Sequence, residues 1–427
     1  MKECLLGDLL DVNRGMSLSG EFYATEGNLV RLTCGNFDYN NNCFKENHSK
    51  DDIYFTGTVK PQFIMDKDDL ITPLTEQAIG LLGSTAFVPE GGKYIQSQDV
   101  AKITCKEGKL DKNYAFYLIS SNGVKKQLSA CAQQTKIRHT SPDAIKACKV
   151  FVHDYPTQKK IGKFFRTIDE KIALNQQINR NLEELASLIY DYWFVQFDFP
   201  NEKGKPYKSC GGKMVWNCTL KREIPENWDV KSINQISTSV RGVTYNSTDE
   251  KNQDDDNVVM ILRGNNIANN KIVYDSNTVF VDSSLVSSEQ FIKKFDIIMA
   301  MSSGSKEHVG KSAMAMYDLP HSYGAFCSKI VPSPSSRYFL EKFLHSDYFI
   351  KYIRQTSSGT GINNLNSRHF DNIFFAYPPD KIIDAFNSKV EPLYDRISSL
   401  QKESEQLNKL RDFLLPLLMN GQVTLRG

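Results

Sequence analysis

Few segments of this sequence combine residue types and spacing that could do chemistry. Gly310-Lys311-Ser312 ends like a phosphate-binding Walker A loop, but that motif needs a glycine five residues before Gly310, where Ser305 stands. We interpret the segment as a polar loop whose lysine could still meet a phosphate. Tyr377-Pro378-Pro379-Asp380 has the prolines of an adenine-methylating motif without its aromatic residue. Neither segment therefore predicts a reaction carried out by this chain.

The histidines, cysteines and acids predict neither a metal centre nor nucleophilic catalysis. The seven His residues are scattered, and the nine Cys residues include no C-x-x-C pair. Asp169-Glu170-Lys171 is faintly nuclease-like, but it lies in an amphipathic segment and fits a solvated charged face. We therefore predict no catalytic residue, no metal and no cofactor bound by this chain. The odd cysteine count and the early acidic residues predict reduced thiols in a cytoplasmic protein.

The composition is that of a folded protein with two or three domains. The 427 residues include 40% hydrophobic and 24% charged residues, which excludes collagen-like, coiled-coil-only and wholly disordered chains. No apolar run approaches the length of a membrane span. The 52 basic and 50 acidic residues give a net charge of +2, which at first argues against a nucleic-acid binder.

An internal repeat organises the chain. Three short segments recur 227 residues later: Arg14-Gly15 as Arg241-Gly242, Asp69-Leu-Ile71 as Asp296-Ile-Ile298, and Lys102-Ile103 as Lys329-Ile330. Each match is weak alone, but their order is the same in both copies. The period is too long for a solenoid, so the repeat predicts two similar domains.

Charge is segregated within each copy. Residues 1–92 carry 7 basic and 14 acidic residues, whereas residues 93–150 carry 11 and 4. The second copy repeats the pattern, with 5 and 10 in residues 225–292 and 10 and 5 in residues 293–370. The basic part of each copy could face a phosphate backbone. The alternative, that the two parts intermix in space and neutralise each other, stays open.

Each copy leads into a long helical segment with one apolar stripe. The segments follow Tyr155-Pro156 and Tyr377-Pro378, and Thr157 or Asp380 could cap them. A helix over residues 157–194 would span roughly 57 Å at about 1.5 Å per residue. We expect the two stripes to pair as in a coiled coil, although each helix could instead pack only on its own domain. The stripes comprise Ile161, Phe165, Ile168, Ile172, Leu182, Leu185 and Ile189, and Val390, Leu393, Ile397, Leu400, Leu407, Leu410 and Leu414.

At this point the sequence resembles, over essentially its whole length, the specificity subunits of type I restriction–modification systems. The characteristic segments are Trp193–Pro200, Lys205–Gly212 and Leu220–Trp228, and Ile168-Asp-Glu-Lys-Ile172 with Asn175 and Asn179. Gln133-Gln-Thr135 and Ser358-Gly-Thr360 resemble the Gly-Thr loop of the family. The first copy departs from that loop because Gln134 replaces the glycine.

The resemblance implies an α+β fold with two similar mixed α/β target-recognition domains in a pseudo-twofold arrangement. Two long antiparallel helices, packed as a coiled-coil-like pair, would separate them. The implied boundaries are 1–155 for the first recognition domain, 156–196 for the central helix, 197–224 for a linker, 225–378 for the second recognition domain and 379–427 for the distal helix.

The resemblance also implies a non-catalytic subunit that reads an asymmetric bipartite DNA target, with one half-site per recognition domain. Its helices would dock two methyltransferase subunits, which bind S-adenosylmethionine and methylate adenine. The complex can recruit two restriction–translocase subunits. Two similar readers on a rigid spacer would contact double-stranded DNA about one helical turn, ~34 Å, apart.

Polar and basic loop residues are the candidates for DNA contacts. Arginine can bind guanine through two hydrogen bonds, asparagine and glutamine can bind adenine, and hydroxyls serve phosphates or bases. Arg14, Arg241 and Asn265 could instead simply close turns. The candidates are Arg14, Lys93, Gln133, Gln134, Thr135, Lys136, Arg138 and His139 in the first copy, and Arg241, Arg263, Asn265, Ser303, Ser305, Lys306, His308, Lys311, Thr360, Asn363, Asn364 and Arg368 in the second.

Two other functions are compatible with the sequence. The chain could be a scaffold or inhibitor that binds a DNA methyltransferase without reading DNA. It could also be a self-sufficient modification enzyme, which the missing cofactor motifs oppose. A preference for one DNA sequence in the presence of the methyltransferase would distinguish a DNA-reading subunit from a scaffold or inhibitor. Methyl transfer by the purified chain would support a self-sufficient enzyme.

Overall fold

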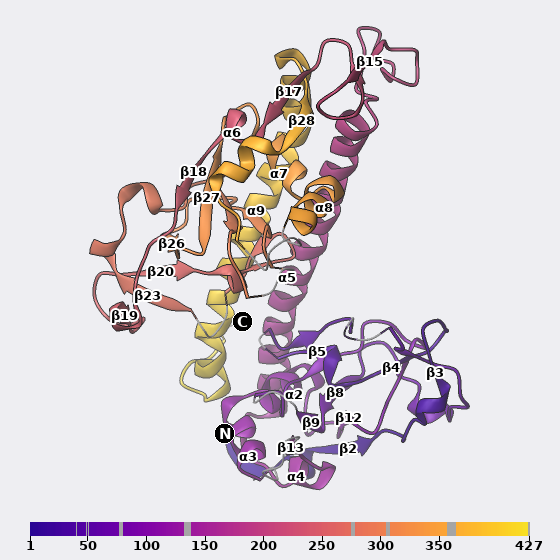
Figure 1. Ribbon diagram of the computed structural model, residues 1–427. Coiled ribbons are helices and arrows are strands. Elements are labelled where there is room, and N and C mark those ends of the chain that lie inside the picture. The colour runs from indigo at the N-terminus through magenta and orange to yellow at the C-terminus, as the bar shows by residue number, and fades with distance from the viewer. Residues whose placement is uncertain are drawn as a thin grey trace. The chain divides into compact units, whose positions relative to one another are not determined.

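A computed structural model describes residues 1–39, 41–47, 49, 51–76, 80–131, 138–274, 278–304, 308–356 and 364–425 (Figure 1). The chain forms two compact units, Met1–Ala173 with Ser404–Gly427, and Leu174–Glu403. All nine cysteines are free thiols. Within the described ranges, every helix is too short or too polar to cross a membrane.

The first unit is built on two four-stranded sheets. One is antiparallel, because each of its three strand pairs is antiparallel, and the other contains the parallel pair β11–β4. Three short helices, α2 (Lys112–Ile119), α3 (Asn122–Cys131) and α4 (Pro142–Lys146), complete the unit. The strand orders are β10 (Ala86–Phe87), β8 (Leu70–Pro73), β12 (Val100–Cys105) and β2 (Leu10–Arg14) in one sheet, and β11 (Tyr94–Ile95), β4 (Val30–Arg31), β7 (Tyr54–Phe55) and β3 (Tyr23–Ala24) in the other.

The second unit repeats this topology strand for strand. Its antiparallel sheet has the same order, and its second sheet again contains one parallel pair, β20–β26. The first sheet comprises β25 (Ser312–Met314), β24 (Ile297–Ala300), β27 (Cys327–Pro332) and β18 (Ser237–Arg241), and the second comprises β26 (His321–Tyr323), β20 (Val258–Leu262), β23 (Val279–Asp282) and β19 (Glu250–Lys251). The duplication predicted from the sequence is therefore confirmed, with two mixed α/β halves.

The smaller elements are duplicated as well. Each copy opens on an antiparallel strand pair that joins its first strand to its last one, followed by a one-turn helix. Each copy also carries two helices after its longest strand. These elements are β1 (Lys2–Leu5), β14 (Lys149–Val152) and α1 (Leu6–Leu9) in the first copy, and β17 (Asp229–Ser232), β28 (Phe374–Tyr377), α6 (Ile233–Ile236), α7 (Arg337–Leu344) and α8 (Asp347–Thr356) in the second.

The charged residues of the repeat form the same ion pair in both copies. Lys102 Nζ lies 2.6 Å from Asp69 Oδ2, and Lys329 Nζ lies 3.0 Å from Asp296 Oδ2. Each pair joins the longest strand of its sheet to the turn that precedes the adjacent strand. The second pair is the more buried, with both side chains 6% exposed against 26% and 15% in the first. The repeated residues thus hold neighbouring strands together.

The repeated Arg-Gly pair marks a place where two backbone segments nearly touch. A Cβ on Gly15 would lie 2.2 Å from the carbonyl oxygen of Ser97, and a Cβ on Gly242 would lie 2.2 Å from that of Gly324. Real Cβ atoms do not approach an oxygen so closely, so the position requires glycine in both copies. Close approach of the backbone, rather than a turn conformation, explains the repeated glycine.

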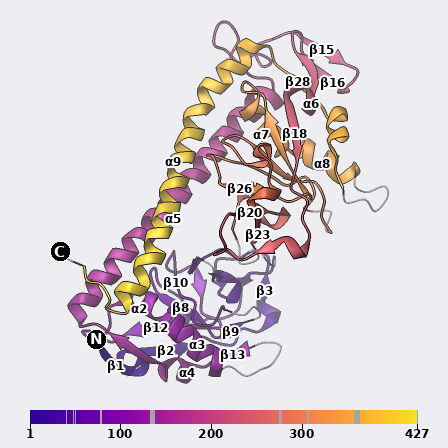
Figure 2. The ribbon, with the colours of Figure 1, turned by 90° about the vertical axis from the view of Figure 1, so that its left-hand side faces the viewer.

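Two long helices, α5 (Tyr155–Tyr190) and α9 (Asp380–Met419), lie side by side (Figure 2). In the first unit the beginning of α5 packs with the end of α9, where Phe165 and Leu418 share one core and Arg411 Nη1 lies 2.9 Å from Asp169 Oδ1. In the second unit the end of α5 packs with the beginning of α9, where Tyr190 stands next to Phe386. The helices are therefore antiparallel, as expected.

Most of the predicted stripe is buried. Ile161, Phe165, Ile168, Ile172, Val390, Ile397 and Leu400 are at most 7% exposed, and Leu182, Ile189, Leu393, Leu407 and Leu414 are partly buried. Leu185 and Leu410 differ, because each remains 44% exposed. These two side chains therefore do not belong to the buried part of the stripe.

The start of α5 corrects the predicted cap. Thr157 lies inside the helix, which begins at Tyr155, and Asp154 is the residue that receives its hydrogen bonds. The Thr157 hydroxyl and backbone N–H both donate to that carboxylate and lower the pKa of Asp154. Asp380 is the first residue of α9, where an acidic side chain is favourable next to the free N–H groups.

A tyrosine–carboxylate hydrogen bond fastens each domain to a long helix. In the first unit Tyr117 of α2 donates to Asp169 of α5 at 2.5 Å, and in the second Tyr394 of α9 donates to Glu341 of α7 at 2.5 Å. The donor and the acceptor have exchanged sides between the copies. The contact itself is therefore common to both copies, although the residue types are not.

The carboxylate of Glu341 is buried but stays ionised. Burial by itself would raise the pKa of Glu341, but Lys342 and His345 more than offset it and lower the pKa to about 2. Lys342 Nζ lies 3.3 Å from the carboxylate and His345 Nδ1 lies 3.0 Å from it. The domain is thus joined to α9 through a charged group that needs these partners.

The segment between the copies is folded rather than extended. Strands β15 (Met214–Asn217) and β16 (Arg222–Pro225) form an antiparallel hairpin. Before it, Phe197 and Phe199 are buried against Trp228, with ring centroids 5.2 and 5.3 Å from that of the indole. The Arg222 guanidinium lies 4.7 Å above the Phe197 ring. Aromatic packing therefore ties this segment to the second unit.

Candidate nucleic-acid interface

In the second unit, the segments that carry the predicted arginines meet one turn. This turn, Gly324–Cys327, connects β26 to β27 and is closed by the Cys327 N–H donating to the Gly324 carbonyl. Gly242, which follows Arg241, donates its N–H to the Cys327 carbonyl. The Gly324 N–H donates to the carbonyl of Leu262, which precedes Arg263. Arg241 is exposed and Arg263 is half-buried. The fold thus holds at one turn two segments that each carry a predicted arginine, although these arginines lie 22 residues apart in the sequence.

A second loop reaches the same turn. The N–H groups of Met301 and Ser302 both donate to the Phe326 carbonyl, at 2.8 and 3.1 Å. The Ser302 hydroxyl donates to the side-chain oxygen of Asn364, and the two residues form an isolated antiparallel bridge. The loop that carries the predicted Ser303 therefore lies beside the predicted Asn364, although the two are far apart in the sequence.

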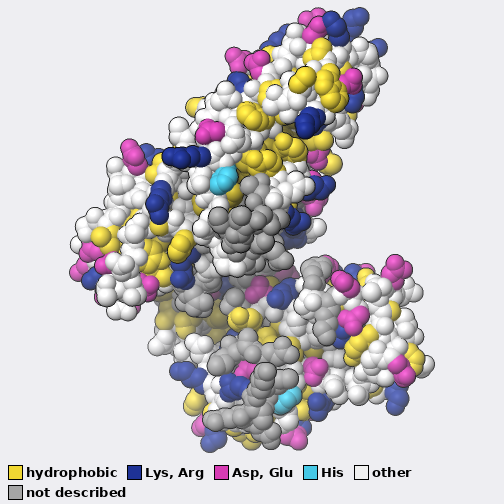
Figure 3. Space-filling model, in the orientation of Figure 1, with side chains coloured by type: hydrophobic (Ala, Val, Ile, Leu, Met, Phe, Trp, Pro, Cys, Tyr) yellow, Lys and Arg dark blue, Asp and Glu magenta, His cyan; other side chains and the backbone are white. Residues whose placement is uncertain are grey.

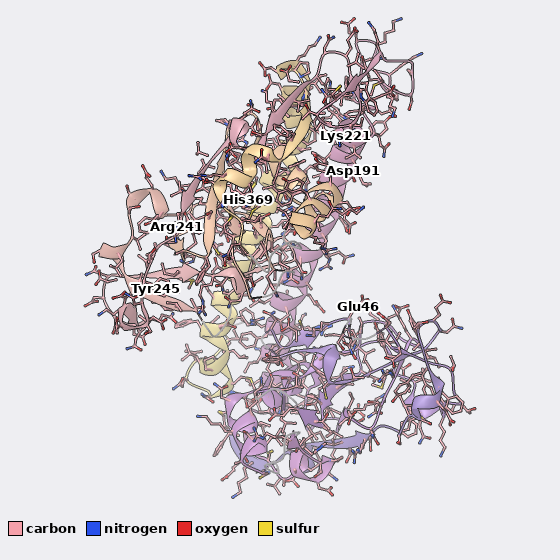
Figure 4. All side chains as sticks on the ribbon, viewed as in Figure 1. Glu46, Asp191, Lys221, Arg241, Tyr245 and His369 are labelled. Atoms are coloured by element: carbon pink, nitrogen blue, oxygen red, sulfur yellow. The ribbon has the colours of Figure 1, made fainter. Side chains whose placement is uncertain are left out.

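A tyrosine that the sequence did not single out lies within this surface. Burial raises the pKa of Tyr245, and the positive charge of Arg263 opposes that shift, so the phenol and the guanidinium lie within electrostatic range. Figure 4 labels Arg241 and Tyr245 together with His369 in the second unit. In Figure 3, the face of this unit that is turned to the viewer shows Lys and Arg side chains together with a histidine. The combination suits a phosphate backbone flanked by bases.

The other predicted residues of the second unit are less closely grouped. His308 and Lys311 are exposed, with 3.3 Å between His308 Nδ1 and Lys311 Nζ. Asn265 is exposed in a short 3-10 turn, and Arg368 is exposed at the start of another. Each of these four exposed side chains could reach a ligand outside the chain.

In the first unit, Arg14 supports a turn that matches Gly324–Cys327. Its Nε donates to the carbonyl of Gln98 at 2.8 Å, in the turn Ser97–Val100. Lys93 forms an exposed ion pair with Glu90 at 3.1 Å, and this hydrogen bond raises the pKa of Lys93. Both basic side chains remain accessible, although both also have a partner within the chain.

Arg138 has a structural role that the sequence did not reveal. Its Nη1 lies 2.9 Å from Glu76 Oε1, a carboxylate that is 2% exposed, and its Nη2 donates to the backbone carbonyl and hydroxyl of Ser129. A guanidinium committed to a buried carboxylate is poorly placed to bind guanine as well. The next residue, His139, is exposed and stays a candidate.

Eight predicted DNA contacts lie outside the residues that the structure describes: Gln133, Gln134, Thr135, Lys136, Ser305, Lys306, Thr360 and Asn363. Both loops that resemble the Gly-Thr loop, residues 133–135 and 358–360, also lie outside the described residues. Across the described ranges, no three His, Cys, Asp or Glu side chains gather in a way that could hold a metal ion.

Besides Tyr245, sequence reasoning missed Phe326 and the stacked pair of Arg31 and Tyr23, in which the guanidinium carbon lies 3.9 Å from the ring centroid. No sequence signal distinguishes Phe326 from the other phenylalanines, of which the chain has 25 in all. Only exposure in the folded chain sets it apart.

Comparison with known proteins identifies the class to which this fold belongs. The family model for the type I restriction modification DNA specificity domain matches residues 1–184 and 225–409. Because this match takes in most of the chain, the chain belongs to that family. The two matched ranges follow the duplication found in the structure.

Individual relatives agree with this assignment. The type I restriction enzyme EcoKI specificity subunit of Escherichia coli (strain K12) is 34% identical over 208 residues, which are 47% of this chain and 44% of that protein. The matched region thus spans less than half of that relative. The HindI specificity subunit of Haemophilus influenzae is 23% identical over 365 residues, covering 73% of this chain and 77% of that protein.

A solved structure shows the same fold over almost the whole chain. The crystal structure of the type I restriction–modification system S subunit from M. genitalium superposes with a TM-score of 0.59 at 16% identity. The superposition covers 98% of this chain and 95% of that one. The likeness concerns the fold, since the identity is low.

Proposed function

We propose that this chain is the non-catalytic, DNA-reading specificity subunit of a type I restriction–modification complex. The observation that carries the proposal is the duplicated recognition fold, each copy of which is fastened to the same pair of long helices. Two readers with different side chains on one scaffold suit an asymmetric bipartite target. Phosphate contacts would position each reader, and contacts with base edges would select the sequence.

We further propose residues 1–155 and 225–378 as the two recognition domains, with residues 156–196 and 379–427 as the helices and 197–224 as the connection. The predicted DNA contacts belong to these domains. A helix pair of fixed length would set the number of unread base pairs between the half-sites. Paired reading heads generally contact DNA about one helical turn, ~34 Å, apart, and the two half-sites would have a separation of that order.

The proposed partners are double-stranded DNA, two methyltransferase subunits and two restriction–translocase subunits. S-adenosylmethionine would be bound by the methyltransferase subunits, and the complex would act in the cytoplasm, where its DNA is. Exposed apolar side chains on the long helices support docking there, because such side chains are favourable where a partner covers them. They are Leu174, Leu185 and Leu188 of α5 and Leu410 and Phe413 of α9, each 44% to 67% exposed.

Methylome sequencing tests the proposal directly. Cells that carry this chain with its methyltransferase subunit should methylate adenine in one bipartite sequence, and the data give both half-sites and the spacer. Replacing residues 1–150 with those of another family member should change one half-site only.

Three outcomes would contradict the model at different points. A change in both half-sites after the exchange would refute the assignment of one reader to each half-site. Binding of the complex to DNA without sequence preference would favour a scaffold or inhibitor. Methyl transfer by the purified chain alone would show an enzyme.

A further inference from the structure

The Gly324–Cys327 turn presents an aromatic side chain that the chain itself leaves uncovered. Phe326 is 73% exposed, more than any other large apolar residue that the structure describes. Its backbone is held in place, because its carbonyl accepts hydrogen bonds from two N–H groups of the neighbouring loop. Single exposed phenylalanines are common on protein surfaces, so exposure alone does not indicate a binding role. The position of Phe326 in the fold does.

That position is the centre of the candidate interface. Hydrogen bonds of the turn reach the segments that carry Arg241 and Arg263, and the loop that carries Ser303. Asn364 is joined to that loop through the Ser302 hydroxyl. A ligand that meets these polar side chains would therefore also meet the phenyl ring.

The matching turn of the first unit has the same framework with a different side chain. Asp99 stands where Phe326 does, and its carbonyl accepts a hydrogen bond from the Leu74 N–H at 2.8 Å, as that of Phe326 does from Met301. The Gly15 N–H donates to Val100 as the Gly242 N–H donates to Cys327. A rigid turn that carries an acid in one reader and an aromatic ring in the other is suited to reading different bases.

We propose that Phe326 contacts the methyl group of a thymine in the half-site read by the second recognition domain. The inference rests on the proposed function, since it needs DNA at this surface. The edge of thymine in the major groove displays a methyl group, the one apolar group among the standard base edges, and phenylalanine is a residue that meets it. Phe326 is then a specificity-determining residue.

The test uses the complex of this chain with its methyltransferase subunits and target duplexes taken from the methylome. Each thymine of the second half-site is replaced in turn by deoxyuridine, which lacks only the methyl group, and methylation rates are measured at subsaturating DNA. At one position the wild-type complex should slow about fourfold, the factor expected for one buried methyl group. Phe326→Ala should slow by a similar or larger factor on unmodified DNA and should not respond to deoxyuridine there.

Two further variants complete the design. Phe326→Leu keeps an apolar side chain and should retain part of the response to the methyl group. Phe151→Ala removes a phenylalanine that is 59% exposed on β14 in the first unit, and it should leave every rate unchanged. Because Phe326 is exposed, its variants should unfold at the wild-type temperature, which shows that they are folded.

The outcomes separate this proposal from the proposed function. Equal deoxyuridine responses in the wild type and in Phe326→Ala at every thymine would overturn the methyl contact and leave the reading function standing. Failure of Phe326→Ala to assemble with the methyltransferase subunits would overturn it as well, by placing the ring against protein. If the wild-type complex methylates DNA without sequence preference, the proposed function itself fails.

Discussion

Removal of Lys329 should destabilise the second unit far more than an ordinary surface substitution. Its ammonium lies 3.0 Å from Asp296 Oδ2 and 3.0 Å from the Phe291 carbonyl, and both charged side chains are 6% exposed. Lys329→Met would keep the apolar stem and leave a buried carboxylate without its counter-charge. Breaking such a pair from one side costs about 3–5 kcal/mol. For a unit of this size, a loss of that order lowers the unfolding temperature by roughly 10 °C.

The repeat supplies a matched comparison. Lys102→Met breaks the equivalent pair in the first unit, where the side chains are 26% and 15% exposed, so water can replace part of the lost interaction. We expect about 1–3 kcal/mol there. Lys294→Met breaks a surface pair with Asp395, with side chains 40% and 59% exposed, and should cost under about 1 kcal/mol.

Calorimetry and hydrogen exchange of the backbone amides in β24 and β27 measure these losses. The double variant Lys329→Met with Asp296→Leu should recover much of the stability, because an apolar pair has no buried charge left over. The reasoning is refuted if Lys329→Met costs no more than Lys102→Met, or if the double variant is less stable than the single one.

Three other predictions follow from the fold. Gly242→Ala should unfold the region around the Gly324 turn and cost more than about 2 kcal/mol, whereas Gly304→Ala, with nothing within 4 Å of the added Cβ, should be tolerated; urea unfolding separates them. The pKa of Glu341 is lowered from 4.5 to about 2, so the contribution of its carboxylate to stability is complete above pH 4.5. That contribution, about 3 kcal/mol, is lost as the pH falls toward 2. A Glu341→Gln variant should therefore show a flatter dependence of the unfolding free energy on pH in acid. Leu188→Ala, at a residue 65% exposed on α5, should leave stability within about 0.5 kcal/mol and weaken binding of the methyltransferase subunit, measured by calorimetric titration.

Several features of this protein could be predicted from local sequence. The repeat of Arg-Gly, Asp and Lys residues located two copies of one domain, and those same residues form equivalent contacts in both copies. The apolar stripes of the helices could be recognised because the spacing of their residues follows the period of a helix. Most of these residues are buried in the structure. Such patterns can be recognised in the sequence because all residues of one pattern pack against the same neighbouring element.

Only part of the candidate interface could be predicted from the sequence. Arg138 and Arg241 are both arginines that the sequence offers as DNA contacts, yet Arg138 pairs with the buried Glu76 and Arg241 is exposed. No neighbouring residue in the sequence indicates this difference, because Glu76 is 62 residues away from Arg138. Burial and pairing of a charge depend on contacts between distant segments.

The sequence by itself determined the duplication, the long helices and the family, because these depend on residue type, spacing and period. Tertiary structure decided which side chains share a surface. It placed Phe326 among the segments of Arg241, Arg263 and Ser303, through backbone hydrogen bonds that any residue can make and that leave no trace in residue type. Strand pairing and turns thus form the candidate interface, whereas the side chains that those turns present differ between the two copies.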